Sequence, residues 1–173
     1  MSDKLSLSFK PKEVTKRLLS VLTKRGQDVL TSRYGLGSKA VKLTLDTIGK
    51  KYNITRERVR QIENHSLLAI RKSKVYKDTQ PIFTELKELI LELGGLVAEK
   101  DLLKHLSKDL NTQNHFHFLL VIGEEFKREK EDEEFKHRWH VDAELSGKIK
   151  AALRNLYSKL ADDELVFEGD LVN

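Results

Sequence analysis

The chain has 173 residues, of which 34% are charged and 39% hydrophobic, and its formal net charge is +5. This composition is typical of a soluble, helix-rich protein with modest cores, and no apolar run approaches the ~18 residues of a membrane span. The absence of cysteine excludes disulfides, thiolate nucleophiles and cysteine-ligated zinc. The N-terminus has no apolar segment typical of a secretory signal, so we expect a cytoplasmic protein.

The charge is distributed unevenly along the chain. Residues 1–76 hold 18 Lys and Arg against 6 Asp and Glu, a balance of +12, whereas residues 77–173 hold 14 against 21, a balance of −7. Such asymmetry indicates a part that faces nucleic acid, joined to an acidic part with another role. We therefore expect the DNA contacts in the first half, because the acidic half would repel phosphate.

Apolar residues recur at helical spacing in four segments of the first half, over residues 12–22, 26–36, 45–52 and from 56 onward. The last two segments each follow a candidate N-cap, Thr44 and Thr55, and a short turn at residues 53–54 separates them. Helix, tight turn and helix is the pattern of a helix-turn-helix. Gly49 lies where two crossing helices would need a residue without a side chain.

The second half has the pattern of a winged helix, three helices followed by a two-stranded hairpin. The polar stretch 77–81 ends in proline and indicates a linker or a helix boundary. The predicted elements beyond it are three helices, a hairpin of two strands with a charged turn, and a last helix, over residues 82–95, 96–110, 112–125, 125–141 and 146–161.

Two short segments of the second half echo one another, "LVAEKDL" at 96–102 and "LVFEGDL" at 165–171. Either a tandem module that is cut short or a coincidental pattern explains the echo. The predicted fold class is mainly α, with a helix-turn-helix DNA-binding domain over residues 1–76 and a winged-helix domain over residues 77–143. A C-terminal helix follows over residues 144–173, and a truncated second winged-helix repeat would explain it.

The segment "TLDTIGKKYNITRERVRQIE" (44–63) resembles the helix-turn-helix of region 4 in bacterial RNA polymerase sigma factors of the primary type. The upstream "GQDVLTSRYGLG" resembles the short helix that precedes it in that family, and the resemblance covers residues ~12–72. It implies that the second helix enters the major groove of the −35 promoter element and that the same region contacts the flap of the polymerase core. The matching contact positions are Arg56, Glu57, Arg60 and Gln61.

The residue types at these positions suit DNA independently of the resemblance. Arginine offers a bidentate donor to guanine, glutamine suits adenine, and a carboxylate accepts a hydrogen bond from cytosine. Phosphate contacts are expected from backbone N–H groups after Thr55 and from Arg58, Lys50 and Lys51. The alternative interpretation of this face is a solvated helix surface. The opposite face is expected to pack against neighbouring helices through Val59, Ile62, Ser66, Leu67 and Ile70.

The sequence also departs from the family pattern. Thr47 stands where the family usually has a glutamate, which removes half of a capping box. Leu68 and Ala69 stand where the family continues with basic residues, so an apolar edge is either exposed or covered by the second domain. Nothing in the chain resembles region 2, the part of a sigma factor that melts the −10 element, so we do not expect a self-sufficient sigma factor.

The second half resembles, more loosely, the winged-helix module of the RNA polymerase delta subunit and related HARE-type domains. This resemblance implies contact with the polymerase or another protein, because the wing sequence "KREKEDEE" (127–134) is too acidic to lie easily on DNA.

The histidines of "HFH" (115–117) and "HRWH" (137–140) raise the question of a metal site, since zinc favours nitrogen ligands. No carboxylate or cysteine completes a familiar local pattern, so we expect surface or packing histidines. No catalytic arrangement is recognisable, and "GLGSK" (35–39) lacks the spacing of a phosphate loop. We therefore predict no enzyme activity, cofactor, metal or small-molecule ligand.

The predicted function is sequence-specific binding of double-stranded promoter DNA in transcription initiation or its regulation. The expected partners are promoter DNA and the RNA polymerase core, through its flap, with no membrane association. Two alternatives remain open: a repressor or activator that never contacts polymerase, and a sigma mimic that occupies the flap without reading DNA.

Overall fold

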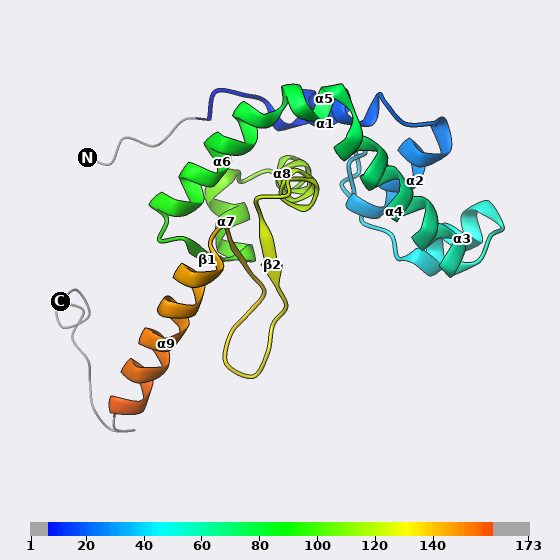
Figure 1. The fold of residues 1–173 in the computed structure, drawn as a ribbon. Helices are drawn as coiled ribbons and strands as arrows, with labels where there is room; N and C mark the ends of the chain where they lie inside the picture. Colours follow the sequence, from blue (N-terminus) through cyan, green and yellow to red (C-terminus); the bar gives the residue numbers. More distant parts are fainter. Residues whose placement is uncertain (1–6, 161–173) are drawn as a thin grey trace. The chain divides into compact units, whose positions relative to one another are not determined.

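The computed structural model describes residues 7–160 (Figure 1). The chain forms two compact units, one ending at Val141 and one beginning at Asp142. The first unit contains both the helix-turn-helix and the winged helix. None of the helices in the described part is long and apolar enough to cross a membrane.

Four helices form the first half of the chain: α1 (Pro11–Leu19), α2 (Lys24–Tyr34), α3 (Leu45–Tyr52) and α4 (Arg56–Lys72). The hydroxyls of Thr23, Thr44 and Thr55 each accept the N–H of the third residue that follows, which confirms the two predicted caps and explains why α2 begins before residue 26. Asn53 adopts a left-handed conformation (φ 54°) that closes the turn between α3 and α4. The predicted helix-turn-helix is confirmed.

Two glycines allow the helices of this half to approach closely. A Cβ on Gly49 would lie 2.7 Å from the backbone oxygen of Ile54, which confirms that this position needs a residue without a side chain. A Cβ on Gly26 would lie 2.8 Å from Ser66 Oγ, where α2 meets α4. A small core then holds α2, α3 and α4 together, with Val29, Ile48 and Val59 fully buried.

The winged half contains α5 (Lys74–Asp78), α6 (Gln80–Glu92), β1 (Leu96–Ala98), α7 (Glu99–Leu106), α8 (Leu110–Ile122), β2 (Lys127–Glu129) and β3 (Arg138–His140). Thr79 separates α5 from α6, so the stretch 77–81 is a helix boundary. The strands form an antiparallel sheet in the order β1-β3-β2, in which Trp139 pairs with both Val97 and Arg128. The mainly α fold with a winged helix is confirmed.

The prediction that residues 96–110 form one helix is wrong. Residues 96–98 form β1, and α7 begins only at Glu99. The strand is three residues long and is stabilised by pairing with β3, which lies about forty residues further along the chain. A local hydrophobic pattern carries no information about that partner.

Helix α8 lies at the centre of the first unit, where Figure 1 views it end-on. It packs against α1, α2 and α4 of the first half and against α7 of the second. Phe118 is fully buried, and its ring meets the ring of Tyr34 edge-on with centroids 5.3 Å apart. The residues on either side of the predicted boundary at residue 76 thus share one hydrophobic core.

Hydrogen bonds to backbone oxygens also join the first half of the chain to α8. The buried Asn114 of α8 donates to the carbonyls of Gly35 and Ala40 in the loop after α2, at 3.0 Å each. The guanidinium of Arg71 on α4 donates to two carbonyls at the C-terminal end of α8, at 2.9 and 3.1 Å. These bonds satisfy backbone groups that would otherwise be costly to bury.

The second unit is described through α9 (Ala143–Lys159). Asp142 accepts the N–H of Leu145, so the helix begins at 143 and not at 146 as predicted. Glu144 and Lys148 form an ion pair of 2.7 Å along its exposed side. The segment 165–171, which echoes 96–102, lies outside the described residues.

Candidate nucleic-acid interface

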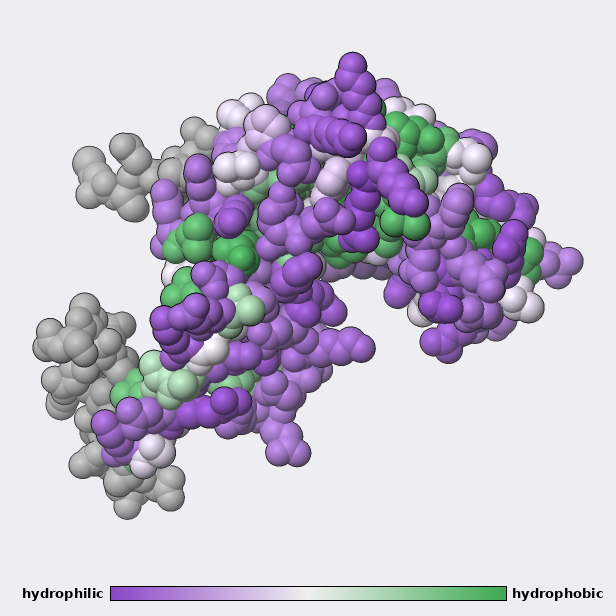
Figure 2. All heavy atoms as spheres, in the orientation of Figure 1, coloured by the Kyte–Doolittle hydropathy of each residue, from purple (hydrophilic) through white to green (hydrophobic). Residues whose placement is uncertain are grey.

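All eight predicted site residues are exposed, on the end of α3, the start of α4 and the N-cap between them: Lys50, Lys51, Thr55, Arg56, Glu57, Arg58, Arg60 and Gln61. Figure 2 shows a mostly hydrophilic surface on this part of the unit. The opposite face of α4 is buried, with Val59 and Ile70 fully enclosed. Helix α4 therefore presents its charged side to solvent while its apolar side holds it in place.

The turn of the helix-turn-helix brings three predicted residues together. Lys50, Thr55 and Arg56 line a recess of about 380 Å³ beside the turn. Arg56 Nη1 lies 3.8 Å from Asp46 Oδ2, both side chains being largely exposed. The Thr55 hydroxyl accepts the Arg58 N–H at 3.1 Å. The expectation that the N–H groups after Thr55 stay free for phosphate is therefore wrong for this donor, because the cap already uses it.

Glu57 and Arg60, which lie about one helical turn apart on α4, form a bidentate ion pair. Arg60 Nε and Nη2 donate to the two carboxylate oxygens at 2.9 and 2.7 Å. These hydrogen bonds lower the pKa of Glu57 and raise the pKa of Arg60, so both groups stay charged at neutral pH. The pair offers an acceptor and a donor at neighbouring positions, which suits a base edge that carries both.

Arg58 and Gln61 lie on the side of α4 that faces the start of α2. They line a recess of about 510 Å³ between the start of α2 and the middle of α4, and Arg58 Nη1 donates to Gln61 Oε1 at 3.1 Å. Arg25 and His65, neither of which was predicted from the sequence, line the same recess. His65 follows Gln61 by four residues, a spacing that the sequence does show. Arg25 lies on another helix, and only the fold brings it here.

The two lysines of α3 are separated by the structure. Lys50 lines the recess at the turn, whereas Lys51 Nζ lies 5.3 Å from the ring centroid of Tyr52. The Arg25 guanidinium lies 5.6 Å from the same centroid. Tyr52 therefore holds two cations near the start of α2 through cation–π contacts.

A buried carboxylate anchors α4 to α2. Glu63 Oε1 accepts a hydrogen bond from the Tyr34 hydroxyl at 3.0 Å, and the same oxygen lies 3.6 Å from Arg33 Nε. Burial, followed by the charge of Glu63, raises the pKa of Tyr34, so the phenol stays protonated and keeps donating. Glu63 follows Val59 by four residues and precedes Ser66 by three, so helical spacing places it on the buried face, although its charge is untypical of a buried position.

Three of the histidines, His115, His117 and His140, occupy packing positions. His115 and His117 both lie in α8, where positions two apart differ by roughly 200° and cannot share a face. His117 Nε2 lies 3.7 Å from Glu99, and His140 Nε2 lies 3.2 Å from Glu129. Within residues 7–160, no three His, Cys, Asp or Glu side chains group as a metal ion would require.

Part of the chain matches known proteins. Residues 18–72 match the family model described as Sigma-70, region 4. The chain is 43% identical over 70 residues to the RNA polymerase sigma factor SigA of Clostridium acetobutylicum, a match that covers 39% of this chain and 18% of that protein. It is 50% identical over 54 residues to SigA1 of Synechococcus elongatus, covering 31% and 13%.

A third relative, SigA of a Nostoc species, is 45% identical over 60 residues, which covers 35% of this chain and 15% of the relative. The chain thus spans less than a fifth of the length of these curated relatives. The match begins in α1, ends at the last residue of α4 and contains every predicted site residue. Residues 18–72 of this chain are therefore a sigma-70 region 4 helix-turn-helix.

Proposed function

We propose that the chain binds double-stranded promoter DNA during transcription initiation or its regulation, with the N-terminal half of α4 in the major groove. Arg56, Glu57, Arg60 and Gln61 face the base edges, and Thr55, Arg58, Lys50 and Lys51 face the phosphates. The observation that supports this proposal is the combination of a region 4 match with an exposed Arg, Glu and Gln face on a helix whose other side is buried.

We also propose that the chain acts with the RNA polymerase core, through its flap. The relatives are named RNA polymerase sigma factors, and the matched segment is a small part of each. A partial sigma or a regulator is therefore the proposed role. The winged half has an acidic tip, residues 131–134, which we assign to a protein contact because like charges would repel DNA.

The test of base readout is the double variant Arg60→Ala, Gln61→Ala. Selection from a randomised duplex library first defines the preferred site of the intact chain. The variant is expected to lose about 2–5 kcal/mol of discrimination between this site and random DNA. The matched control is Arg17→Ala, Lys16→Ala on α1, outside the proposed interface. Unchanged discrimination in the α4 variant would exclude base readout and favour a sigma mimic.

The test of the polymerase partner is footprinting on the selected site with and without core enzyme. A partial sigma is expected to bind the selected site more tightly when core enzyme is present, because the DNA then contacts the chain and the enzyme together. A repressor or activator that works alone would show the same footprint and the same affinity in both conditions.

A further inference from the structure

Among the described residues, Arg56 is the proposed base contact that pairs with a different helix. It is the first residue of α4, so no residue of that helix lies a turn before it to hold its side chain. Its Nη1 lies 3.8 Å from Oδ2 of Asp46, in the first turn of α3. The other three proposed base contacts have their partners within α4, as in the pair of Glu57 with Arg60.

Asp46 is the carboxylate that is available to Arg56. Within α3 it is the only acidic residue, and Thr47 beside it carries no charge and has its hydroxyl 2.9 Å from that of the N-cap. Glu57 follows Arg56 in α4, but its two carboxylate oxygens already accept hydrogen bonds from Arg60. The negative charge opposite Arg56 therefore comes from α3.

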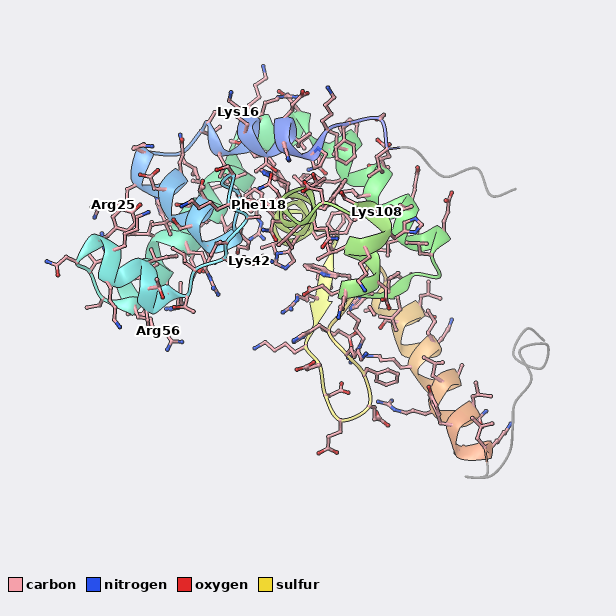
Figure 3. The ribbon with its side chains drawn as sticks, turned by 180° about the vertical axis from the view of Figure 1, so that it is seen from behind. Lys16, Arg25, Lys42, Arg56, Lys108 and Phe118 are labelled. Carbon is pink, nitrogen blue, oxygen red and sulfur yellow. The ribbon has the colours of Figure 1, made fainter. Side chains whose placement is uncertain are left out.

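The turn between α3 and α4 fixes the separation of this pair. Gly49 lies about one turn after Asp46, and a Cβ there would lie 2.7 Å from the Ile54 oxygen and 3.5 Å from the Arg56 nitrogen. Asp46, Gly49 and Arg56 all line the recess of about 380 Å³ beside the turn. This close contact prevents α3 from sliding along α4, so Asp46 stays within reach of Arg56. Figure 3 shows Arg56 at the outer edge of the helix-turn-helix, away from Phe118 of α8.

The exposure of the pair leaves it open to DNA. The side chains of Arg56 and Asp46 are 69% and 62% exposed, so their attraction adds little to folding stability. An arginine on a groove-facing helix can donate either to a base edge or to a phosphate, and only the first contact reads sequence. A carboxylate beside the arginine restrains its side chain and repels a phosphate at that place, which favours the base edge.

We propose that Asp46 is a positioning residue for base readout, which holds the Arg56 guanidinium toward the base edges and away from the phosphate backbone. The proposal rests on the proposed function, since it requires that Arg56 contacts a base. Without Asp46 the chain would bind random DNA more tightly and discriminate less between sites.

The test compares Asp46→Asn with Asp46→Glu, which keeps the charge, and with Glu13→Gln as a matched control. Glu13 lies in the first turn of α1 and pairs with Lys10 at 3.7 Å, so its substitution removes a comparable charge away from Arg56. Affinities of the intact chain for the selected duplex and for a random duplex are measured across a salt series.

In Asp46→Asn the ratio of the two affinities is expected to fall about two- to fivefold, the range that an exposed ion pair supplies. The released arginine should bind a phosphate of random DNA, which steepens the slope of log affinity against log salt by up to about 0.9. Asp46→Glu and Glu13→Gln are expected to keep the wild-type ratio and slope.

A double-variant cycle tests whether Asp46 acts through Arg56. In an Arg56→Ala background, Asp46→Asn is expected to leave the affinity ratio unchanged. Repeated selection with each single variant should relax the preference at the same base pair. An equal loss of ratio in the Arg56→Ala background, or relaxation at a different base pair, overturns the proposal.

The outcomes separate this proposal from the proposed function. A wild-type chain that discriminates, with a ratio and slope that Asp46→Asn leaves unchanged, overturns the positioning role alone. Equal weakening on both duplexes, an equal loss in Glu13→Gln, or a loss in Asp46→Glu as large as in Asp46→Asn also overturns it. A wild-type chain that does not discriminate between the duplexes overturns both proposals. Thermal melts of each variant verify the fold.

Discussion

Acid is expected to destabilise the first unit through His117. The ring is 14% exposed and sits between Lys42 and Glu99, with burial lowering its pKa from 6.5 to about 4. In the unfolded chain the same ring takes up a proton near pH 6.5. Between these two values the unfolded state binds more protons than the native state, so the free energy of unfolding falls as the pH is lowered.

The size of the effect follows from the two pKa values. A difference of about 2.5 pH units at about 1.4 kcal/mol each corresponds to roughly 3 kcal/mol, lost between pH 6.5 and pH 4. Glu99 adds a loss of the same sign at lower pH, because its own pKa is lowered by Arg128 and His117 despite burial. The measurement is urea unfolding of the wild type and of His117→Gln at a series of pH values.

The variant isolates the contribution of one ring. His115, whose pKa burial also lowers, and the other titrating groups remain in both chains. The wild type is therefore expected to lose roughly 3 kcal/mol more than His117→Gln over this range. Parallel pH profiles, or a His117 titration near pH 6.5 by NMR, would refute the reasoning.

Three further substitutions probe stability. Thr55→Ala removes the cap of α4 and should cost ~1 kcal/mol in urea unfolding, whereas an unchanged midpoint would mean that another group caps the helix. Gly49→Ala places a Cβ 2.7 Å from the Ile54 oxygen and should lower the free energy of unfolding by about 1–3 kcal/mol. The control Gly147→Ala, whose Cβ meets nothing within 4 Å, should not destabilise its helix. Equal effects of the two substitutions would contradict the close approach at Gly49. Asn114→Ala leaves two carbonyls without their donor and should cost about 2–4 kcal/mol by calorimetry, a neutral result indicating that water replaces the amide.

The helix-turn-helix was predictable because its determinants are local. Thr44 and Thr55 each cap a helix by accepting the N–H group three residues further along the chain. Gly49 lies against the backbone of a residue five positions away. The Arg and Gln face of α4 follows from helical periodicity alone. Each of these features lies within one or two helical turns of the residues that specify it.

Features that depend on distant partners were not predictable. Strand β1 needs β3, and the recess beside Gln61 needs Arg25 from another helix. Helix α8 is rich in apolar residues, but only the fold shows that the core around it is shared with α1, α2 and α4.

The enclosure of α8 has a consequence for cooperativity. Helix α8 packs against both halves of the first unit, so unfolding of either half alone would expose its apolar surface to water. The two halves are therefore expected to melt in a single transition. A ligand at α4 would then protect the entire unit, by about 2.7 kcal/mol at a concentration of ~100 times its dissociation constant. Amide hydrogens of α8, which carries none of the proposed DNA contacts, would exchange more slowly once α4 is occupied.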